Sequence, residues 1–341
     1  MPDLVCLGEP MIEFNRQKPG ADGRVHWLEG HGGDTSNCAI AAARQGASAG
    51  YITAIGADPF GDALMALWAA EGVDASAVIR RTDAPTGLYF VTHSERGHEF
   101  TFARAGSAAS RMTKAEIPEA YIARAKILET SAISQAISTN ANEAVLHAMA
   151  LAKARGVVIA YDTNLRLRLW PLETARPAIE AACRLAGTVF TSDEEAAALW
   201  GHKEPDAVAD AVLALGPETV VVKQGGKGAL VATRGRRERI AGHAVKAVDA
   251  TGAGDTFAGA FLARRLAGDD VFAAARYANA AAALKTEGYG AVAPIPRPEA
   301  VRKLVGTRAY RPSPVGALRA LLPAACGRSC RGARPALADA R

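Results

Sequence analysis

Residues 248–268, VDATGAGDTFAGAFLARRLAG, combine a helix start made of small residues with a single carboxylate. Gly252, Ala253 and Gly254 leave backbone N–H groups open to an anionic oxygen, and the helix dipole makes this end electropositive. Asp255 follows directly and can accept a proton from a hydroxyl that attacks an anionic centre held there. This pattern indicates phosphoryl transfer to an alcohol.

A tight turn followed by an ordinary first-turn or capping acid is the alternative interpretation of the same residues. Two further glycine-rich turns favour the chemical interpretation. KQGGKG, residues 223–228, follows an expected strand, and GHGGDTSNCAIAAARQG, residues 30–46, leads into an expected helix. Three such turns in one chain indicate a polyanionic ligand that contacts several loops.

Short apolar runs that end in Gly, Ser, Asn or Asp alternate with Ala- and Leu-rich segments of helical length. Continuous apolarity is typical of strands covered on both faces, so these runs predict a buried parallel sheet. The expected strands are residues 4–8, 49–56, 125–134, 156–164, 187–192 and 219–225, and the expected helices are 34–45, 60–71, 139–155, 171–185 and 205–215. The alternation predicts a doubly wound α/β domain with helices on both faces of a mainly parallel sheet.

Residues 13–30 and 87–104 instead alternate apolar and polar side chains around glycine-containing turns. This is the pattern of hairpins with one solvent-exposed face. We expect the two hairpins to pair into a small antiparallel sheet that projects from the main domain. Over the carboxyl ends of the parallel strands it would act as a lid, because open α/β sheets bind ligands at that edge.

The positive charge of the 341-residue chain is concentrated at its end. Residues 306–341 contain seven Arg and one Asp, whereas the whole chain has a net charge of +5, so residues 1–305 are close to neutral. A nucleic-acid-binding surface is therefore not expected on the main body. The Arg-, Ala- and Pro-rich segment 306–341 is expected to be disordered, which leaves 1–305 as the folded domain.

Cysteines, histidines and apolar segments exclude several classes of protein. Cys326 and Cys330 have no second pair that would complete a metal site, and the other three cysteines are scattered. The seven histidines show no His-x-x-x-His spacing, so zinc is not expected. The first residues lack a basic start followed by an apolar run, and no segment approaches about 18 uninterrupted apolar residues. We expect a cytoplasmic protein with no membrane partner.

Two of these motifs resemble a known family. VDATGAGDTFAGAF is similar to the C-terminal signature of the ribokinase-like (PfkB) carbohydrate kinases, and GGDTSNCAIAAARQG followed by IGADPFGDAL is similar to their N-terminal signature. The resemblance covers residues 3–305. It implies a ribokinase-like fold, with the sugar between the sheet and a β-sheet lid and ATP in a groove on the C-terminal side. It also implies Mg2+ and a monovalent-cation site, for which K+ is the candidate ion.

The resemblance implies roles residue by residue. Asp255 matches the catalytic base, and the amides of Gly252, Ala253 and Gly254 match those that stabilise charge on the transferred phosphoryl group. Positions near the nucleotide are matched by Asn164, Ser192, Lys223, Gly225, Gly228, Gly252, Gly254 and Asn279, and the monovalent-cation site by Asp249 and Thr251. The family commonly has Asn-x-x-Glu where this chain has Ser192 and Glu195, and Glu195 would organise Mg2+ through water.

Two arginines at the sheet edge expected to bind the ligand give information on the chemical class of the phosphate acceptor. Arg166 follows a strand in DTNLRLRLW, and Arg104 ends the second hairpin. Two guanidinium groups fit a carboxylate, with which they form paired hydrogen bonds, better than a neutral sugar. The alternative is that Arg166 holds the ATP phosphates and Arg104 makes a salt bridge on the lid.

Within the family, GEPMIEF, the aromatic hairpin and D-x-N-x-R-x-x-L-W look like the 2-keto-3-deoxygluconate kinases. This implies that the sugar acid contacts Gly33, Asn37, Tyr89, Phe102, Arg104, Arg166 and Asp255. Tyrosine is usual at the position of Phe102, so one hydroxyl is missing. The expected function is ATP-dependent phosphorylation of 2-keto-3-deoxy-D-gluconate. A kinase for fructose or ribose and a non-catalytic sugar-binding regulator are the alternatives, and the resemblance allows a homodimer or higher homo-oligomer through the lid.

Overall fold

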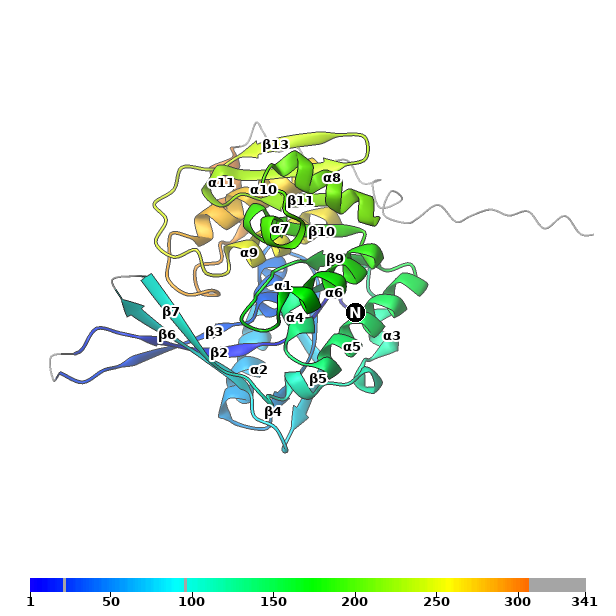
Figure 1. Ribbon diagram of the computed structural model, residues 1–341. Coiled ribbons are helices and arrows are strands. Elements are labelled where there is room, and N and C mark those ends of the chain that lie inside the picture. The colour runs from blue at the N-terminus through cyan, green and yellow to red at the C-terminus, as the bar shows by residue number, and fades with distance from the viewer. Residues whose placement is uncertain (21–22, 95–96, 307–341) are drawn as a thin grey trace, which may run out of the picture.

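A nine-stranded sheet runs through the part of the chain that the computed structural model describes, residues 1–20, 23–94 and 97–306 (Figure 1). Its strand order is β13-β12-β11-β10-β9-β8-β1-β4-β5. Neighbouring strands from β11 to β5 are parallel, whereas β12 and β13 are antiparallel. The strands are β1 (Leu4–Leu7), β4 (Ala49–Gly56), β5 (Asp74–Arg81), β8 (Ile127–Ser131), β9 (Val158–Asp162), β10 (Thr188–Ser192), β11 (Thr219–Lys223), β12 (Gly228–Thr233) and β13 (Arg237–Ala241).

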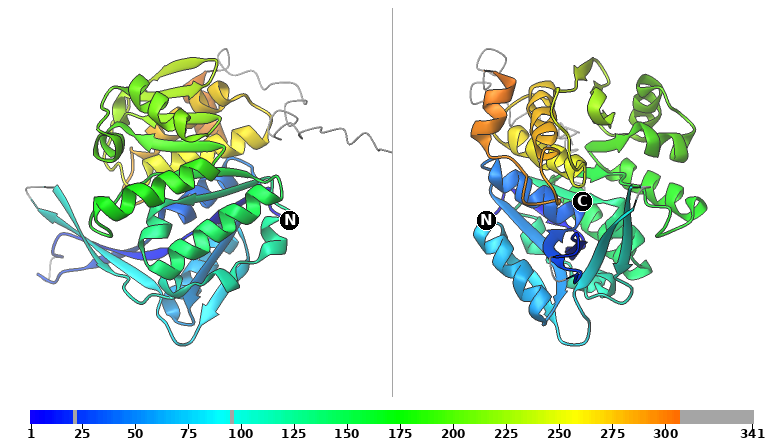
Figure 2. Two further views of the ribbon diagram at one scale, coloured as in Figure 1. Left: turned by 45° about the vertical axis from the view of Figure 1, so that its right-hand side comes forward. Right: turned by 90° about the vertical axis from the view of Figure 1, so that its left-hand side faces the viewer.

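Helices cover both faces of this sheet, which confirms the expected doubly wound α/β architecture (Figure 2). One face carries α1 (Asp34–Arg44), α2 (Pro59–Glu71), α9 (Ala253–Leu266), α10 (Val271–Lys285) and α11 (Pro298–Val305). The other carries α3 (Glu119–Ile122), α4 (Ala132–Ala136), α5 (Thr139–Ala154), α6 (Leu172–Leu185), α7 (Asp193–Trp200) and α8 (Pro205–Leu215). Each face buries its own apolar cluster against the sheet. Within the described residues, no helix has the length and apolar character needed to cross a bilayer.

The two expected hairpins pair into a second, four-stranded sheet of order β3-β2-β6-β7 that projects from the body (Figure 1). Its strands are β2 (Met11–Arg16), β3 (Trp27–Gly32), β6 (Gly87–Ser94) and β7 (Gly97–Ala103). Both hairpins are antiparallel, but β2 and β6 pair in parallel, so the sheet is not antiparallel throughout. Along the chain, β2 follows β1 and β6 follows β5. Because β1 and β5 run in the same direction, β2 and β6 both leave the main sheet at the carboxyl ends of its strands.

Helix α11 is the last element that the structure describes. Helix α11 finishes at Val305, and the structure describes Gly306 as its last residue. The segment expected to be disordered, with Cys326 and Cys330, otherwise lies outside the described residues.

A glycine allows α9 to lie directly against α1. A Cβ atom on Gly259 would lie 2.3 Å from the carbonyl oxygen of Cys38, a distance that side chains do not tolerate. Close approach of the two backbones places Asp255, one turn before Gly259, beside Asn37, the residue before Cys38. The glycine therefore aligns α1 and α9, the two helices that carry the motifs similar to the family signatures.

Gly259→Ala should lower the free energy of unfolding by about 1–3 kcal/mol, because the added methyl group overpacks the helix contact. This loss should exceed the gain of about 1 kcal/mol that alanine brings to a helix. Gly235→Ala is the control, since a Cβ atom there meets nothing within 4 Å. Urea unfolding measures both variants, and equal stability of the two would contradict the close approach.

Candidate active site

The start of α9 presents free backbone amides. Gly252, the N-cap residue, has a left-handed backbone (φ 77°, ψ 6°) that glycine adopts without strain. The amide of Ala253 donates to the carbonyl of Ala250 (3.1 Å), whereas the described residues offer no backbone acceptor to the amides of Gly252 and Gly254. We call these two amides the anion cradle, because they lie at the positive end of the helix dipole and can bind an anionic oxygen.

Asp255 lies half-buried in the first turn of α9. Its Oδ2 accepts a hydrogen bond from the Nδ2 of Asn37 (2.8 Å). Burial and the negative charge of Asp34 raise the pKa of Asp255 to about 7, although the hydrogen bond from Asn37 and the ammonium of Lys223 oppose the shift. A carboxylate that titrates near neutral pH is suited to general base catalysis.

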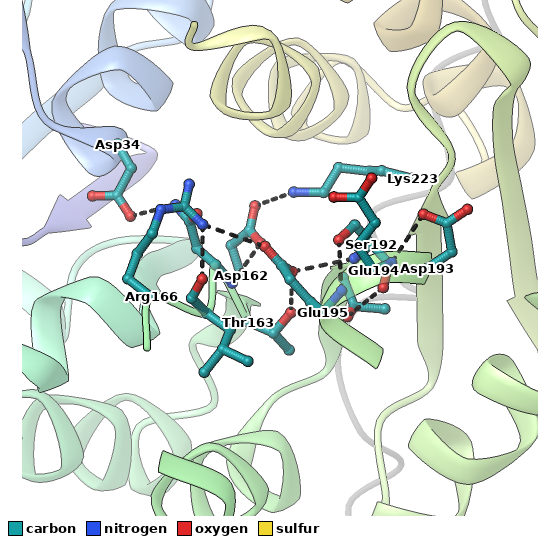
Figure 3. A network of polar contacts seen from close by, with 12 residues as sticks. Asp34, Asp162, Thr163, Arg166, Ser192, Asp193, Glu194, Glu195 and Lys223 are labelled. Carbon is teal, nitrogen blue, oxygen red and sulfur yellow. Dashed lines mark hydrogen bonds and ion pairs between the residues drawn. The ribbon is translucent and has the colours of Figure 1, made fainter. Parts of the chain in front are cut away.

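Lys223 brings a positive charge to the cradle from the end of β11. Its Nζ forms an ion pair with Asp162 at the end of β9 (2.6 Å, Figure 3). A Cβ atom on Gly254 would lie 3.2 Å from this Nζ, so the glycine keeps the ammonium next to the cradle. Burial lowers the pKa of Lys223, but the carboxylates of Asp162 and Glu195 outweigh burial and raise it above its ordinary value. The ammonium therefore stays charged beside the start of α9.

Ser192 and Glu195, the pair that departs from the family pattern, form a capping box at the start of α7. The Ser192 Oγ accepts from the Glu195 amide (3.1 Å), and the Glu195 Oε2 accepts from the Ser192 amide (3.2 Å) and from Thr163 Oγ1 (2.7 Å). Burial raises the pKa of Glu195, although Lys223 opposes the shift. Glu195 and Asp162 supply the hard oxygen donors that Mg2+ prefers, so the donor set fits this ion.

Near the start of α1, two side-chain oxygens have no hydrogen-bond partner among the described residues. Gly33 has φ 104°, and a Cβ atom there would lie 2.4 Å from the carbonyl oxygen of Glu9. Asp34 accepts from Asn164 Nδ2 through its Oδ2 (2.8 Å). Its Oδ1 and the Oδ1 of Asn37 are buried without a hydrogen-bond partner in the described part of the chain. Buried polar atoms are rarely left unpaired, so these two oxygens are available to accept hydrogen bonds from a ligand or from water.

The small sheet contributes Tyr89, Phe102 and Arg104. Tyr89 and Phe102 are cross-strand partners on β6 and β7; the Tyr89 hydroxyl is buried and donates to Glu13, whereas Phe102 is 42% exposed. Arg104 forms an ion pair with the buried Glu9, which lies between β1 and β2 and not on the small sheet. Its Nε is nevertheless buried without a partner among the residues described, so the guanidinium keeps one donor for a ligand.

Arg166 lies on the loop after β9 with 52% of its side chain exposed. Its Nη1 donates to the Leu165 carbonyl (2.9 Å) and lies 3.7 Å from Oε1 of Glu195, within the charged network of Figure 3. Such a long, exposed ion pair leaves the guanidinium able to turn to an anionic ligand. Arg168 of the same loop donates to the Phe100 carbonyl of β7 (3.4 Å), so the loop touches the small sheet.

Gly225, Gly228 and Asn279 lie in the C-terminal half of the domain. Gly225 (φ 54°) begins the 3₁₀ turn between β11 and β12, and a Cβ atom on Gly228 (φ 103°) would lie 1.9 Å from the Ile240 carbonyl oxygen. Asn279 on α10 is buried and donates to the Ala241 carbonyl (2.8 Å). These contacts explain the two glycines and the amide structurally, and their contacts with a nucleotide stay predictions.

Asp249 and Thr251, matched to a monovalent-cation site, lie in the loop before α9. The Asp249 Oδ1 accepts from the Thr251 amide (2.8 Å), and its Oδ2 accepts from the Gly290 amide (2.8 Å). The carbonyl oxygen of Asp249 accepts from the Nζ of Lys285 (2.9 Å). Asp249 therefore ties this loop to residues that follow α10.

Sequence reasoning did not single out Glu9, Asp34, Asp162 and Lys285. Glu9 follows β1 and Asp162 ends β9, so the rule that carboxyl ends of parallel strands meet at one edge could have found both. Asp34 stands directly after the glycines that begin α1. Lys285 looks like a normal last-turn base of a helix and carried no signal.

Comparison with known proteins points to carbohydrate kinases. The model of a family described as "pfkB family carbohydrate kinase" matches residues 1–298. A probable fructokinase-5 of Arabidopsis thaliana is 34% identical over 319 residues, which cover 90% of this chain and 98% of the relative. A 2-dehydro-3-deoxygluconokinase of Thermoproteus tenax is 35% identical over 311 residues, with 89% and 94% covered. Fructokinases and 2-dehydro-3-deoxygluconokinases are thus similar to this chain to about the same degree.

A solved structure has the same fold as this chain. A double mutant of Vibrio cholerae O395 fructokinase, with fructose, ADP and a potassium ion bound, superposes with a TM-score of 0.80 at 28% identity. The match covers 89% of this chain and 98% of the fructokinase.

Proposed function

The chain belongs to the pfkB family of carbohydrate kinases, and from this premise we propose that it uses ATP to phosphorylate the primary hydroxyl of a sugar acid, 2-keto-3-deoxy-D-gluconate at O6. The observation that carries the proposal is the position of Asp255. Its carboxylate, with a pKa of about 7, lies in the first turn of the helix whose Gly252 and Gly254 amides form the anion cradle.

In the proposed reaction, the sugar hydroxyl oxygen attacks the γ-phosphorus of ATP while Asp255 accepts the hydroxyl proton. The bond between the γ-phosphorus and the bridging oxygen breaks, and ADP leaves. The amides of Gly252 and Gly254 and the ammonium of Lys223 stabilise the charge on the transferred group. Mg2+, when bound near Glu195 and Asp162, supplies neutralisation of the phosphate charge.

The proposed sugar contacts are based on side-chain atoms that have no hydrogen-bond partner within the described residues. The Oδ1 atoms of Asp34 and Asn37 are acceptors for sugar hydroxyls, because each is buried and unpaired within the described ranges. The Arg104 Nε is a buried donor, and Arg166 is half-exposed and held by one long ion pair. These two guanidinium groups support a carboxylate on the substrate.

Fructose is the second candidate acceptor. The ion pair with Glu9 already offsets the charge of Arg104, which suits a neutral sugar. Phe102 offers no hydroxyl where the 2-keto-3-deoxygluconate kinases usually have tyrosine, and fructokinases are similar to this chain at comparable identity. Arg166 is therefore the residue whose substitution should distinguish a sugar acid from fructose as the acceptor.

Asp255→Asn should lower kcat by about 10²–10⁴-fold, the usual contribution of a general base, while the Kd of the sugar changes little. A coupled assay for ADP release and calorimetric titration of the sugar measure the two quantities. Asp62→Asn is the control, since Asp62 is also a first-turn acid, on α2, and 64% of its side chain is exposed. Near-normal turnover of the Asp255 variant would show that this residue is only a first-turn acid.

Arg166→Ala should raise KM for 2-keto-3-deoxy-D-gluconate by about tenfold or more, because a hydrogen bond between charged groups is lost, and should leave KM for fructose and for ATP unchanged. Arg168→Ala, two positions along the same exposed loop, is the matched control. Steady-state kinetics with both sugars at varied ATP separates the outcomes. A rise in the KM of ATP with either sugar would instead assign Arg166 to the phosphates.

A further inference from the structure

Lys285, the last residue of α10, is a lysine with no exposed surface. Its Nζ donates to the backbone carbonyl of Asp249 (2.9 Å). Across the described ranges of the chain, no carboxylate lies within ion-pair distance of this ammonium. Burial lowers the pKa of Lys285, whereas the charges of Asp249, Asp255 and Glu13 favour the charged form. A buried lysine without a paired carboxylate is costly, so its position calls for a specific role.

The acceptor of this hydrogen bond belongs to the loop that begins the anion cradle. The amides of Val248 and Asp249 donate to the Thr286 carbonyl (2.6 and 3.0 Å), and the Asp249 Oδ2 accepts from the Gly290 amide. A Cβ atom on Gly252 would lie 3.1 Å from the Ala291 carbonyl oxygen. The segment from 285 to 291 therefore braces the loop that holds Gly252 in place.

The Asp249 carbonyl lies next to a positive charge in the structure. That oxygen already accepts from an ammonium, and both carboxylate oxygens of Asp249 accept backbone amides. A potassium ion in contact with the same carbonyl would lie against a second positive charge and be repelled. In the structure, a cationic side chain of the chain itself therefore donates to one carbonyl oxygen of the expected K+ site.

We propose that the ammonium of Lys285 takes the place of an exchangeable monovalent cation beside the anion cradle, so that this kinase works without K+. The inference rests on the proposed phosphoryl transfer at Asp255. Lys285 is a positioning residue: it holds the Asp249 carbonyl, and through it the loop up to Gly252, in the geometry that a bound ion would otherwise maintain. The Vibrio cholerae fructokinase structure of the same fold contains a potassium ion, so a comparison of ion dependence with that enzyme is informative.

The first test uses the unmodified full-length protein. Calorimetric titration with MgADP and thermal unfolding are compared in KCl and in tetramethylammonium chloride at equal ionic strength. We expect the same Kd and the same Tm in both salts, and the same kcat with the best sugar. Tightening of MgADP binding by about tenfold in KCl, within the usual range of coupling between sites, would overturn the inference. Absence of MgADP binding in either salt would instead contradict the proposed function.

The second test removes the ammonium. Lys285→Ala should bind MgADP about tenfold more weakly in tetramethylammonium chloride and regain much of this loss in KCl. The loop residues Val248, Gly290 and Ala291, which are neighbours of Asp249 in the chain or in the loop after α10, line a cavity of about 1170 Å³. Lys303→Ala, at an exposed position on α11, is the control and should respond to neither salt.

Lys285→Met keeps about the same side-chain volume but removes the charge. It replaces Lys285→Ala in the same MgADP titrations if the alanine variant does not fold. A loss of MgADP binding that KCl does not restore in the folded variant would contradict the replacement of an ion, because it would assign Lys285 a role in packing alone. Rescue by KCl but not by tetramethylammonium chloride is the result that supports it.

Discussion

The proposed function depends on one carboxylate, that of Asp255, which lies at the N-terminus of a helix and has a pKa raised to about 7. Asp255 and Asn37 are 218 positions apart, and their hydrogen bond forms because Gly259 lets α9 lie directly against α1. Burial and the charge of Asp34 raise the pKa of Asp255, while the free amides of α9 provide the site for an anion next to it. The proposed proton acceptor and the free amides therefore share the first turn of α9, and the contact with α1 positions the carboxylate.

Basic side chains balance the acids around this carboxylate, each with a different partner. Lys223 pairs with Asp162, Arg104 pairs with Glu9, and Lys285 donates to a backbone carbonyl. Buried charges are costly unless they are paired or hydrogen-bonded, so these contacts allow a polar centre to exist in the interior. Lys223 and Lys285 reach the start of α9 from different elements, β11 and α10, and both favour negative charge at the cradle.

The alternation of apolar runs and Ala-rich segments was enough to predict the doubly wound sheet, and the glycine-rich turns located the cradle. The edge strands β5 and β13 escaped prediction because their partial burial breaks the continuous apolar pattern. Strand β12 is buried and apolar but was not separated from the glycine-rich turn that precedes it. The parallel junction of β2 and β6 depends on where the hairpins leave the main sheet, which alternation does not encode. The pair of Arg104 with Glu9 joins residues 95 positions apart and has no local signal.

The pH dependence of kcat/KM tests the central claim most directly, because it reports the ionisation of groups in the free enzyme. The carboxylate must be deprotonated to act as a base, so activity should fall as the pH drops below about 7, the raised pKa of Asp255. Asp34→Asn should move the midpoint of this fall to lower pH, because it removes a charge that raises that pKa. A profile that stays flat down to the ordinary aspartate pKa of 3.8, or a midpoint that Asp34→Asn leaves in place, would contradict the account.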